Sequence, residues 1–441
     1  MRLRNYCMKN KIVLFHPQTD HERNYSFFWI PYSVLSIGSE LEQAGFDVTI
    51  IDANANIDYE KHQLDFDNIL FVGVSAMIGR QISNGIEYVN MIREKSNVPI
   101  LWGGAFPTLL PKMILESKYA DYIIRGPGEH LIVEFALALK YGREIPDGVG
   151  RITGNGINEG VLQRIESSAN LAEYNYDLIN VKDYVRNDIY ISDRVLNYIS
   201  SRGCPYRCGF CTETALYHRK WTAFSADRIV RETTKLLDLG NANAIKFYDA
   251  NFFVDKNRVL DFVRKMISKR DDFLFAASAH PQNILSMSDS EMHLLKKGGL
   301  KRLLVGLESG VQEELDFIPK DLTISQIYDL AKKLSDFEIR GSFTFITGYP
   351  TMPMDNIDKT IEFVEKISEL FPHHEYKVHF FMPYPGTRMY DIAIQQGFVE
   401  PQSLFEWSTY DYYKINMPWV EEKYQNVVDD FNKTHCPYVH L

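Results

Sequence analysis

The stretch NYISSRGCPYRCGFC (residues 197–211) joins a strand-like run to three closely spaced cysteines, Cys204, Cys208 and Cys211. The first six residues of the stretch predict a β-strand, so the cysteines lie in the loop after its carboxyl end. In barrels of repeated strand and helix units, active sites are built from these loops. The stretch therefore predicts a site at the carboxyl-end face of an α/β barrel.

Five further strand candidates follow the cysteines, and helical spacing separates them. They are AIKFYD (244–249), FLFAASA (273–279), KRLLVGLE (301–308), SFTFITG (342–348) and YKVHFFM (376–382). Alternation of strand and helix predicts a parallel sheet. Six such units predict an incomplete (β/α)6 barrel, two units short of the closed eight-unit form.

The first third of the chain predicts a separate doubly wound, Rossmann-like sheet. Its strand candidates are KIVLF (11–15), FDVTIID (46–52), ILFVGVSA (69–76), VPILWGG (98–104) and DYIIRG (121–126), with helical segments at 31–44, 81–94, 109–117 and 129–140. We therefore expect a doubly wound domain at 1–142, a linker with a hairpin at 143–195, the barrel at 196–390 and an aromatic-rich cap at 391–441.

Composition narrows the classes of function. The net charge of −10 argues against general nucleic-acid binding, which needs clustered Lys and Arg. No apolar run reaches bilayer length and the start does not resemble a signal peptide, so we expect a cytoplasmic protein without a membrane segment. Five cysteines, three of them crowded together, do not suggest a disulfide framework, and Cys7 and Cys436 are interpreted as ordinary thiols.

Three thiolates on one short loop suit a [4Fe-4S] cluster. They can bind three irons and leave the fourth iron open, whereas structural zinc needs four ligands in a closed tetrahedron. Two alternatives remain: a zinc site completed by a histidine such as His218, and three unrelated thiols.

The CxxxCxxC spacing, with Phe210 before the last cysteine, resembles the signature of radical S-adenosylmethionine (SAM) enzymes, over residues 197–388. The resemblance implies that the methionyl group of SAM chelates the open iron and that reductive cleavage yields a 5′-deoxyadenosyl radical. Phe210 would lie against the adenine, and His280 stands where many relatives have an arginine for the methionine carboxylate. The other implied SAM positions are Asp249 near the methionyl group, Glu308 at the ribose, and Ile346 and Gly348 along the adenine.

The first domain resembles the cobalamin-binding domain of B12-dependent radical enzymes. The resemblance is carried by WIPYSVLSIGSELEQAGFDVTIIDAN (29–54), GGAFPT (103–108) and RGPGE (125–129); no DxHxxG motif is present. It implies that Met77 and Ile78 meet the lower cobalt face and that Gly103, Gly104, Gly126 and Glu129 contact the cofactor. Two alternatives stay open: the glycines serve only tight turns, and the domain, with Phe106 where relatives show histidine, has lost cobalamin.

The resemblance implies a cobalamin-dependent radical C-methyltransferase that acts on a small molecule or peptide of secondary metabolism, with an electron donor such as flavodoxin or ferredoxin. A radical cyclase, dehydratase or deoxygenase, with cobalamin absent or non-methylating, is the first alternative. A non-catalytic cobalamin or metal sensor is the second. A methylthiotransferase is disfavoured because its second cluster would need three more clustered cysteines.

Overall fold

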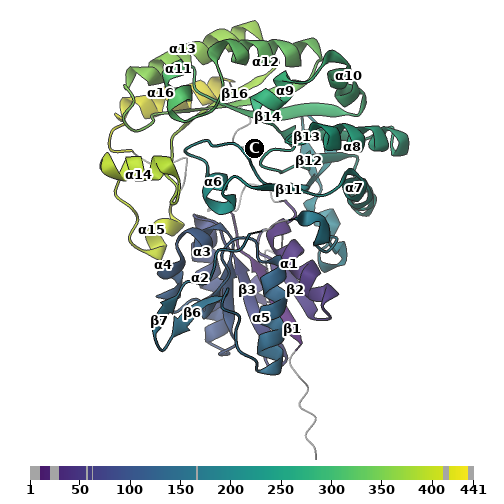
Figure 1. The fold of residues 1–441 in the computed structure, drawn as a ribbon, viewed down its shortest axis with the longest axis vertical. Helices are drawn as coiled ribbons and strands as arrows, with labels where there is room; N and C mark the ends of the chain where they lie inside the picture. The colour runs from purple at the N-terminus through teal and green to yellow at the C-terminus, as the bar shows by residue number, and fades with distance from the viewer. Residues whose placement is uncertain are drawn as a thin grey trace, which may run out of the picture. The chain divides into compact units, whose positions relative to one another are not determined.

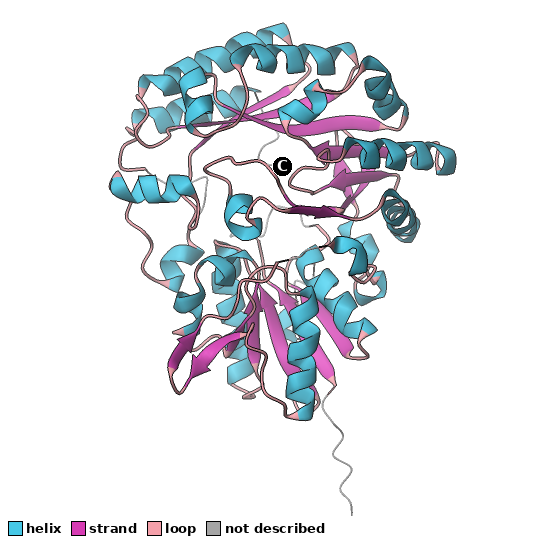
Figure 2. Cartoon of the chain, viewed as in Figure 1, coloured by secondary structure: helices cyan, strands magenta, loops and turns pink. Residues whose placement is uncertain are grey.

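The computed structural model describes residues 10–19, 29–55, 58–61, 63–164, 167–410 and 417–435, so Cys7 and Cys436 lie outside the described residues. The chain divides into two compact units. The first contains Met1–Tyr184 and Pro401–Tyr410, and the second contains Val185–Glu400 and Asp411–Leu441. Each unit is built on a seven-stranded sheet (Figures 1 and 2).

The sheet of the first unit has the order β2-β1-β3-β4-β5-β6-β7. Its first five strands are parallel, and the hairpin β6-β7 continues the sheet antiparallel to β5. The strands are β1 (Lys11–His16), β2 (Asp47–Asp52), β3 (Ile69–Ser75), β4 (Ile100–Gly103), β5 (Tyr122–Ile123), β6 (Gly150–Thr153) and β7 (Gly156–Asn158). The helices are α1 (Tyr32–Gln43), α2 (Arg80–Arg93), α3 (Ala105–Leu109), α4 (Pro111–Leu115), α5 (Glu129–Tyr141) and α15 (Leu404–Ser408).

The five predicted strands of this unit are present, although β5 is shorter than predicted, and the helices predicted at 31–44, 81–94 and 129–140 are confirmed. The continuous apolar runs of the central strands are buried on both faces of the parallel sheet. Helices α1 and α5 pack on one face of the sheet, where Phe71 and Phe135 meet edge to face. The segment predicted as one helix at 109–117 is instead divided: α4 begins at Pro111, whose missing N–H is tolerated at the first helical position.

The sheet of the second unit has the order β16-β15-β14-β13-β12-β9-β8, parallel except for β8. Its strands are β8 (Arg186–Asp188), β9 (Ser192–Tyr198), β12 (Ala244–Phe247), β13 (Leu274–Ser278), β14 (Leu300–Glu308), β15 (Arg340–Thr347) and β16 (Glu375–Phe380). The helices are α6 (Thr212–Tyr217), α7 (Ala226–Gly240), α8 (Lys256–Lys269), α9 (Pro281–Leu285), α10 (Asp289–Lys297), α11 (Gln312–Phe317), α12 (Ile324–Asp336), α13 (Asp355–Leu370), α14 (Arg388–Gln395) and α16 (Lys423–His435). Six parallel strands confirm the predicted partial barrel.

The two faces of this curled sheet differ in burial. Helices such as α12 and α13 cover the outer face (Figure 1). Leu303, Phe343 and Val378 on this face are fully buried. The alternating residues on the inner face, such as Thr344 and Ile346, remain partly exposed. The helices therefore supply the core, and the inner face stays accessible.

The first barrel strand differs from its predicted span of 197–202. Strand β9 ends at Tyr198, and a separate short strand, β10 (Ser201–Gly203), pairs with β11 (Trp221–Ala223). The break occurs because Ser200 and Ser201 turn to hydrogen-bond Asp249. The chain reaches the cysteines through this ribbon and not directly from the barrel strand.

The C-terminal tail contributes to both units. Helix α15 packs on α2 in the first unit, and α16 packs on β16 in the second. The Asn432 side chain donates to the Val378 carbonyl and accepts from the Val378 N–H, which covers the edge strand of the barrel sheet. Among the described residues, no helix combines the length and the apolar character needed to cross a membrane.

Candidate functional site

The loop that carries the cysteines is fixed at several points within the barrel unit. Gly203 takes φ of +75°, and a Cβ there would overlap the Lys220 carbonyl, so only glycine fits before Cys204. Farther along, the Gly209 N–H donates to the Ile318 carbonyl at 3.1 Å, and the Met389 N–H donates to the Gly209 carbonyl at 3.0 Å. Segments far apart in sequence therefore hold the loop in one conformation.

Burial raises the pKa of all three thiols of this loop. The pKa of Cys211 reaches about 12 because of burial, although a hydrogen bond from the Glu213 backbone opposes the rise. The positive charge of Lys320 partly opposes the rise at Cys204 and Cys208. Because buried thiolates are costly without a cation, the loop suits a metal group that binds sulfur and supplies positive charge.

The zinc alternative requires His218 to complete a four-ligand site with the cysteines. Within the described part of the chain, no three His, Cys, Asp or Glu side chains gather closely enough to hold one metal ion. His218 instead ends helix α6 in a left-handed conformation. A four-iron cube is larger than a single ion, so it does not require its thiolate ligands to converge in this way.

Glu308 and Lys320 form a buried ion pair beside the cysteine loop. Lys320 Nζ lies 2.7 Å from Glu308 Oε1, and each side chain is only 7% exposed. Glu308 has φ of +69°, a strained conformation for a non-glycine residue. A Cβ at Gly306 would overlap Glu308 Oε1, so Gly306 makes room for the carboxylate. Strain and burial concentrated here are typical of a binding site.

Asp249 links the carboxyl ends of β12 and β9 by hydrogen bonds. Its carboxylate accepts hydrogen bonds from the Ser200 N–H at 2.8 Å, Ser200 Oγ at 2.6 Å and Ser201 Oγ at 2.5 Å. Burial raises the pKa of this carboxyl, while Arg258 and the serines oppose the rise. Asp249 is thus placed to position the loop, and its contact with the methionyl group stays a prediction.

His280 lies against the same loop as a neutral ring. It stacks on Tyr206 with ring centroids 3.5 Å apart, and burial, together with the charge of Lys320, lowers its pKa to about 3. Nδ1 accepts from the Gln282 N–H, so Nε2 carries the hydrogen and donates to the Lys320 carbonyl at 3.2 Å. A neutral imidazole cannot supply the positive charge of the arginine that it replaces in the resemblance.

The remaining predicted SAM positions lie at the carboxyl end of β15. Gly348 takes φ of +72°, and its carbonyl accepts from Trp419 Nε1 at 3.0 Å. Ile346 is partly exposed on the inner face. The Phe210 ring lies 6.5 Å from the ring of Tyr349, the residue after Gly348. Phe210, Ile346 and Gly348 are thus brought to the same end of the barrel, and their contacts with adenine stay predictions.

In the first unit, the loops after β3 and β4 bind each other. The Ala76 N–H donates to the Gly103 carbonyl at 2.9 Å, and the Phe106 N–H donates to the Ala76 carbonyl at 3.0 Å. Gly104 has φ of +98°, and a Cβ there would lie 2.7 Å from the Ala76 oxygen. Gly104 therefore serves a close approach between two loops, and Phe106 is fully buried against Trp102.

The other predicted cobalamin positions differ in exposure. Met77 is 54% exposed and Ile78 is partly exposed. Gly126 takes φ of +76°, and its N–H donates to Thr108 Oγ1 at 2.8 Å. Glu129 is buried at the start of α5, where its Oε1 accepts from Ser36 Oγ at 2.9 Å. Of this set, Met77 has the most accessible side chain.

Sequence reasoning missed several residues of these sites. Lys320, Gly306 and Tyr206 belong to the barrel site, and a His16–Asp52 pair lies at the carboxyl ends of β1 and β2. His16 Nδ1 lies 3.0 Å from Asp52 Oδ1. The available signal was positional: His16 directly follows one predicted parallel strand and Asp52 ends another, and ligands of such sheets bind at these strand ends. For Lys320 no comparable signal exists, because its segment reads as an ordinary surface loop.

Two family matches cover most of both sheets. Residues 23–136 match the B12 binding domain, and residues 198–364 match the radical SAM superfamily. The first match spans the loops with Met77 and Gly104. The second spans the cysteine triad, Glu308 and Lys320.

Relatives and solved structures agree with these matches. The chain is 26% identical over 319 residues to an uncharacterized methyltransferase of Pyrococcus horikoshii, covering 71% of this chain and 67% of the relative. It is 22% identical over 383 residues to an anaerobic magnesium-protoporphyrin IX monomethyl ester cyclase of Synechocystis, covering 84% and 74%. The structure of the radical SAM methyltransferase TsrM from Kitasatospora setae matches with a TM-score of 0.67 at 19% identity, covering 88% and 75%, which shows a shared fold.

Proposed function

Because this chain belongs to the radical SAM superfamily and carries a B12-binding domain, we propose that it is a cobalamin-dependent radical C-methyltransferase acting on a small molecule or peptide. The two domains imply a [4Fe-4S] cluster, SAM and cobalamin as cofactors, together with a substrate and a reductant. The observation that carries the proposal is the pairing of these domains in one chain. When bound, the cluster supplies the electron that cleaves SAM, and cobalamin supplies the methyl group.

The role of the cysteine loop in this proposal is to hold the cluster. Cys204, Cys208 and Cys211 would bind three irons, and the anchored backbone at Gly209 would keep the loop in place. Asp249 would act as a positioning residue through Ser200. The burial of the thiols supports this role because it excludes water from the sulfur ligands.

Charge at the barrel site supports binding of the methionyl group of SAM. Lys320 is the cation whose field reaches Cys208 and Cys211, whereas His280 is neutral at physiological pH. We therefore assign the methionine carboxylate to the field of Lys320 rather than to His280, with Glu308 facing the ribose. On the first domain, exposed Met77 would lie at the lower face of the corrin.

The test is anaerobic reconstitution followed by incubation with methyl-labelled SAM, a candidate substrate and reduced flavodoxin or ferredoxin. Methyl transfer predicts S-adenosylhomocysteine and labelled product together with 5′-deoxyadenosine. Cys208→Ala should abolish 5′-deoxyadenosine, while the matched variant Cys436→Ala, outside the triad, should retain it.

The cyclase relative supports a second candidate, a radical cyclase in which cobalamin does not methylate. That reaction predicts 5′-deoxyadenosine without S-adenosylhomocysteine. Absence of both products under reduction would overturn both candidates and leave the non-catalytic sensor. Magnesium-protoporphyrin monomethyl ester as substrate separates the two candidates further. Only a cyclase would convert it to a product that carries no methyl label.

A further inference from the structure

The inner face of the barrel sheet gathers basic side chains from separate strands. Register places Lys246 of β12 beside Ala276, and Ala276 beside Arg302 of β14. Arg302 reaches across to Ser342 of β15, and Thr344 of the same strand pairs with Lys377 of β16. Directly paired residues of a parallel sheet point to the same face, and the opposite face is packed under helices. Lys246, Arg302 and Lys377 therefore share the inner face.

The carboxylates on this face are already engaged by Arg302. Its Nη2 lies 2.5 Å from Glu375 Oε2, and its Nη1 lies 3.4 Å from Asp188 Oδ2. Lys246 is farther from Asp188, at 4.0 Å. Lys377 has no hydrogen bond or ion pair to any residue that the structure describes, although it is half-buried. Arg302 thus has both of these carboxylates as partners, whereas Lys377 has none among the described residues.

Repulsion from neighbouring cations acts on Lys246. Burial, and then repulsion by Arg302 and Lys377, lowers its pKa to about 8. An anion placed between the two lysines would relieve that repulsion and favour both charged forms. Two residues that carry hydroxyl groups are neighbours of these lysines. The ring centroid of Tyr248, which is 41% exposed, lies 5.3 Å from Lys246 Nζ, and the partly exposed Thr344 pairs with Lys377 in the sheet register. Ammonium groups with adjacent hydroxyls are a donor set for oxyanions.

We propose that Lys246 and Lys377 bind an anionic oxygen group of the substrate: a phosphate ester, a phosphonate or a carboxylate. The inference rests on the proposed function in taking the barrel's inner face as the substrate side. It adds a substrate class that the family matches do not assign to this chain. Lys377, which has no ion-pair partner among the described residues, is the main ligand, and Lys246 is the second.

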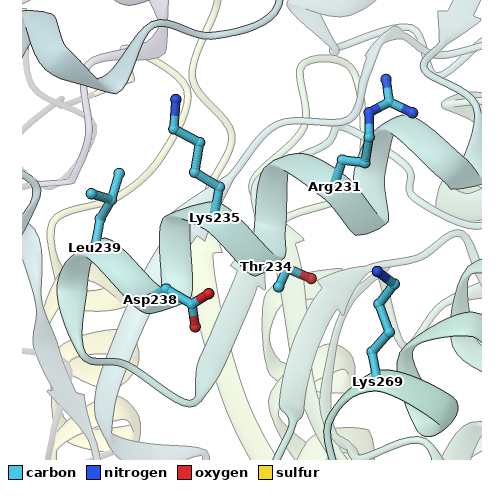
Figure 3. Close-up of a pocket in the computed structure, with 6 residues that line it drawn as sticks. All are labelled: Arg231, Thr234, Lys235, Asp238, Leu239 and Lys269. Carbon is cyan, nitrogen blue, oxygen red and sulfur yellow. The ribbon is translucent and has the colours of Figure 1, made fainter.

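The test is lysine footprinting of the anaerobic holoenzyme with an acetylating reagent and peptide mass spectrometry. Inorganic phosphate and acetate serve as separate probes, which distinguishes a phosphoryl group from a carboxylate. Internal controls come from a basic depression on the outside of the barrel, where Lys235 of α7 and Lys269 of α8 lie near Arg231 (Figure 3). One of the two anions should slow acetylation of Lys246 and Lys377 about tenfold and leave Lys235 and Lys269 unchanged.

Variants make the assignment specific. Lys377→Met should weaken binding of the protecting anion about tenfold or more, as expected for loss of a charged hydrogen bond, while Lys269→Met should leave it unchanged. Protection of the outer lysines to the same degree, or protection of none by either anion, would overturn the proposal. Because no turnover is measured, these outcomes are independent of methyl transfer. The protein could cleave SAM without binding the anion, or bind the anion without transferring a methyl group.

Discussion

Replacing Lys320 by methionine should destabilise the barrel unit strongly. The change removes one partner of an ion pair with a 2.7 Å separation, and the remaining Glu308 carboxylate is only 7% exposed. Breaking a buried pair in this way costs about 3–5 kcal/mol, because an unpaired charge is left in the interior. The double variant Lys320→Met/Glu308→Gln leaves no charge behind and should recover most of the loss.

The assay is hydrogen exchange of the peptide covering β14, which ends at Glu308. A loss of about 3 kcal/mol should speed its exchange about 100-fold, since each 1.4 kcal/mol is worth a factor of about ten. The matched control is Lys332→Met on α12, whose partner Asp336 lies 2.6 Å away but on the surface, so exchange should barely change. If Lys320→Met exchanges like the Lys332 control, or if the double variant is as unstable as the single one, the pair is not the constraint described above.

Two further predictions concern the first unit. Gly104→Ala should lower the stability of the first unit by about 3 kcal/mol and weaken cobalamin binding, because the new Cβ would clash with Ala76 and the backbone has positive φ. Thermal unfolding and a cobalamin titration measure the two effects. The control is Gly45→Ala, also at positive φ but with open space around it, which should cost about 1 kcal/mol. Burial raises the pKa of Asp52, but the charge of His16 and hydrogen bonds outweigh it, so the folded pKa lies below the unfolded one. The ionised Asp52 carboxylate therefore stabilises the fold above its unfolded pKa, and this stabilisation is lost as the pH falls through its folded pKa. Asp52→Asn should flatten the dependence of the melting temperature on pH below about pH 4. A profile identical to that of the unchanged protein would refute this.

Local patterns were enough to predict most of the fold. The apolar runs of both sheets became strands because each is buried on at least one face, and the cysteine spacing is a local signal on one loop. The order of the motifs along the chain also places Phe210, Glu308 and Gly348 at the carboxyl ends of barrel strands, since every parallel strand delivers its end to the same edge.

Contacts between segments that are distant in the sequence could not be predicted from local patterns. Lys320 follows Glu308 by twelve residues and looks like a surface lysine until the fold buries both. The early end of β9 depends on Asp249, which lies about fifty residues beyond it. Whether Lys246 faces helices or the inner face depends on strand register, because a shift of one residue would reverse it.

Gly104 of the first domain shows how a glycine predicted to contact a ligand can instead serve a contact within the protein. Gly104 was interpreted as a place for close approach of a cofactor, yet the atoms that require it belong to Ala76. Ala76 is held by Gly103 and Phe106, and the Met77 N–H donates to Gln81 Oε1 at 2.8 Å, so the backbone of this loop is fixed while the Met77 side chain projects outward. A loop whose backbone is already fixed, and which exposes one apolar side chain such as Met77, suits contact with a large flat ligand. Little conformational entropy of the loop would be lost on binding. Under the proposed function, the glycine loop would hold Met77 in place for cobalamin. A bulky residue at Gly104 should therefore weaken cobalamin binding without contacting the cofactor.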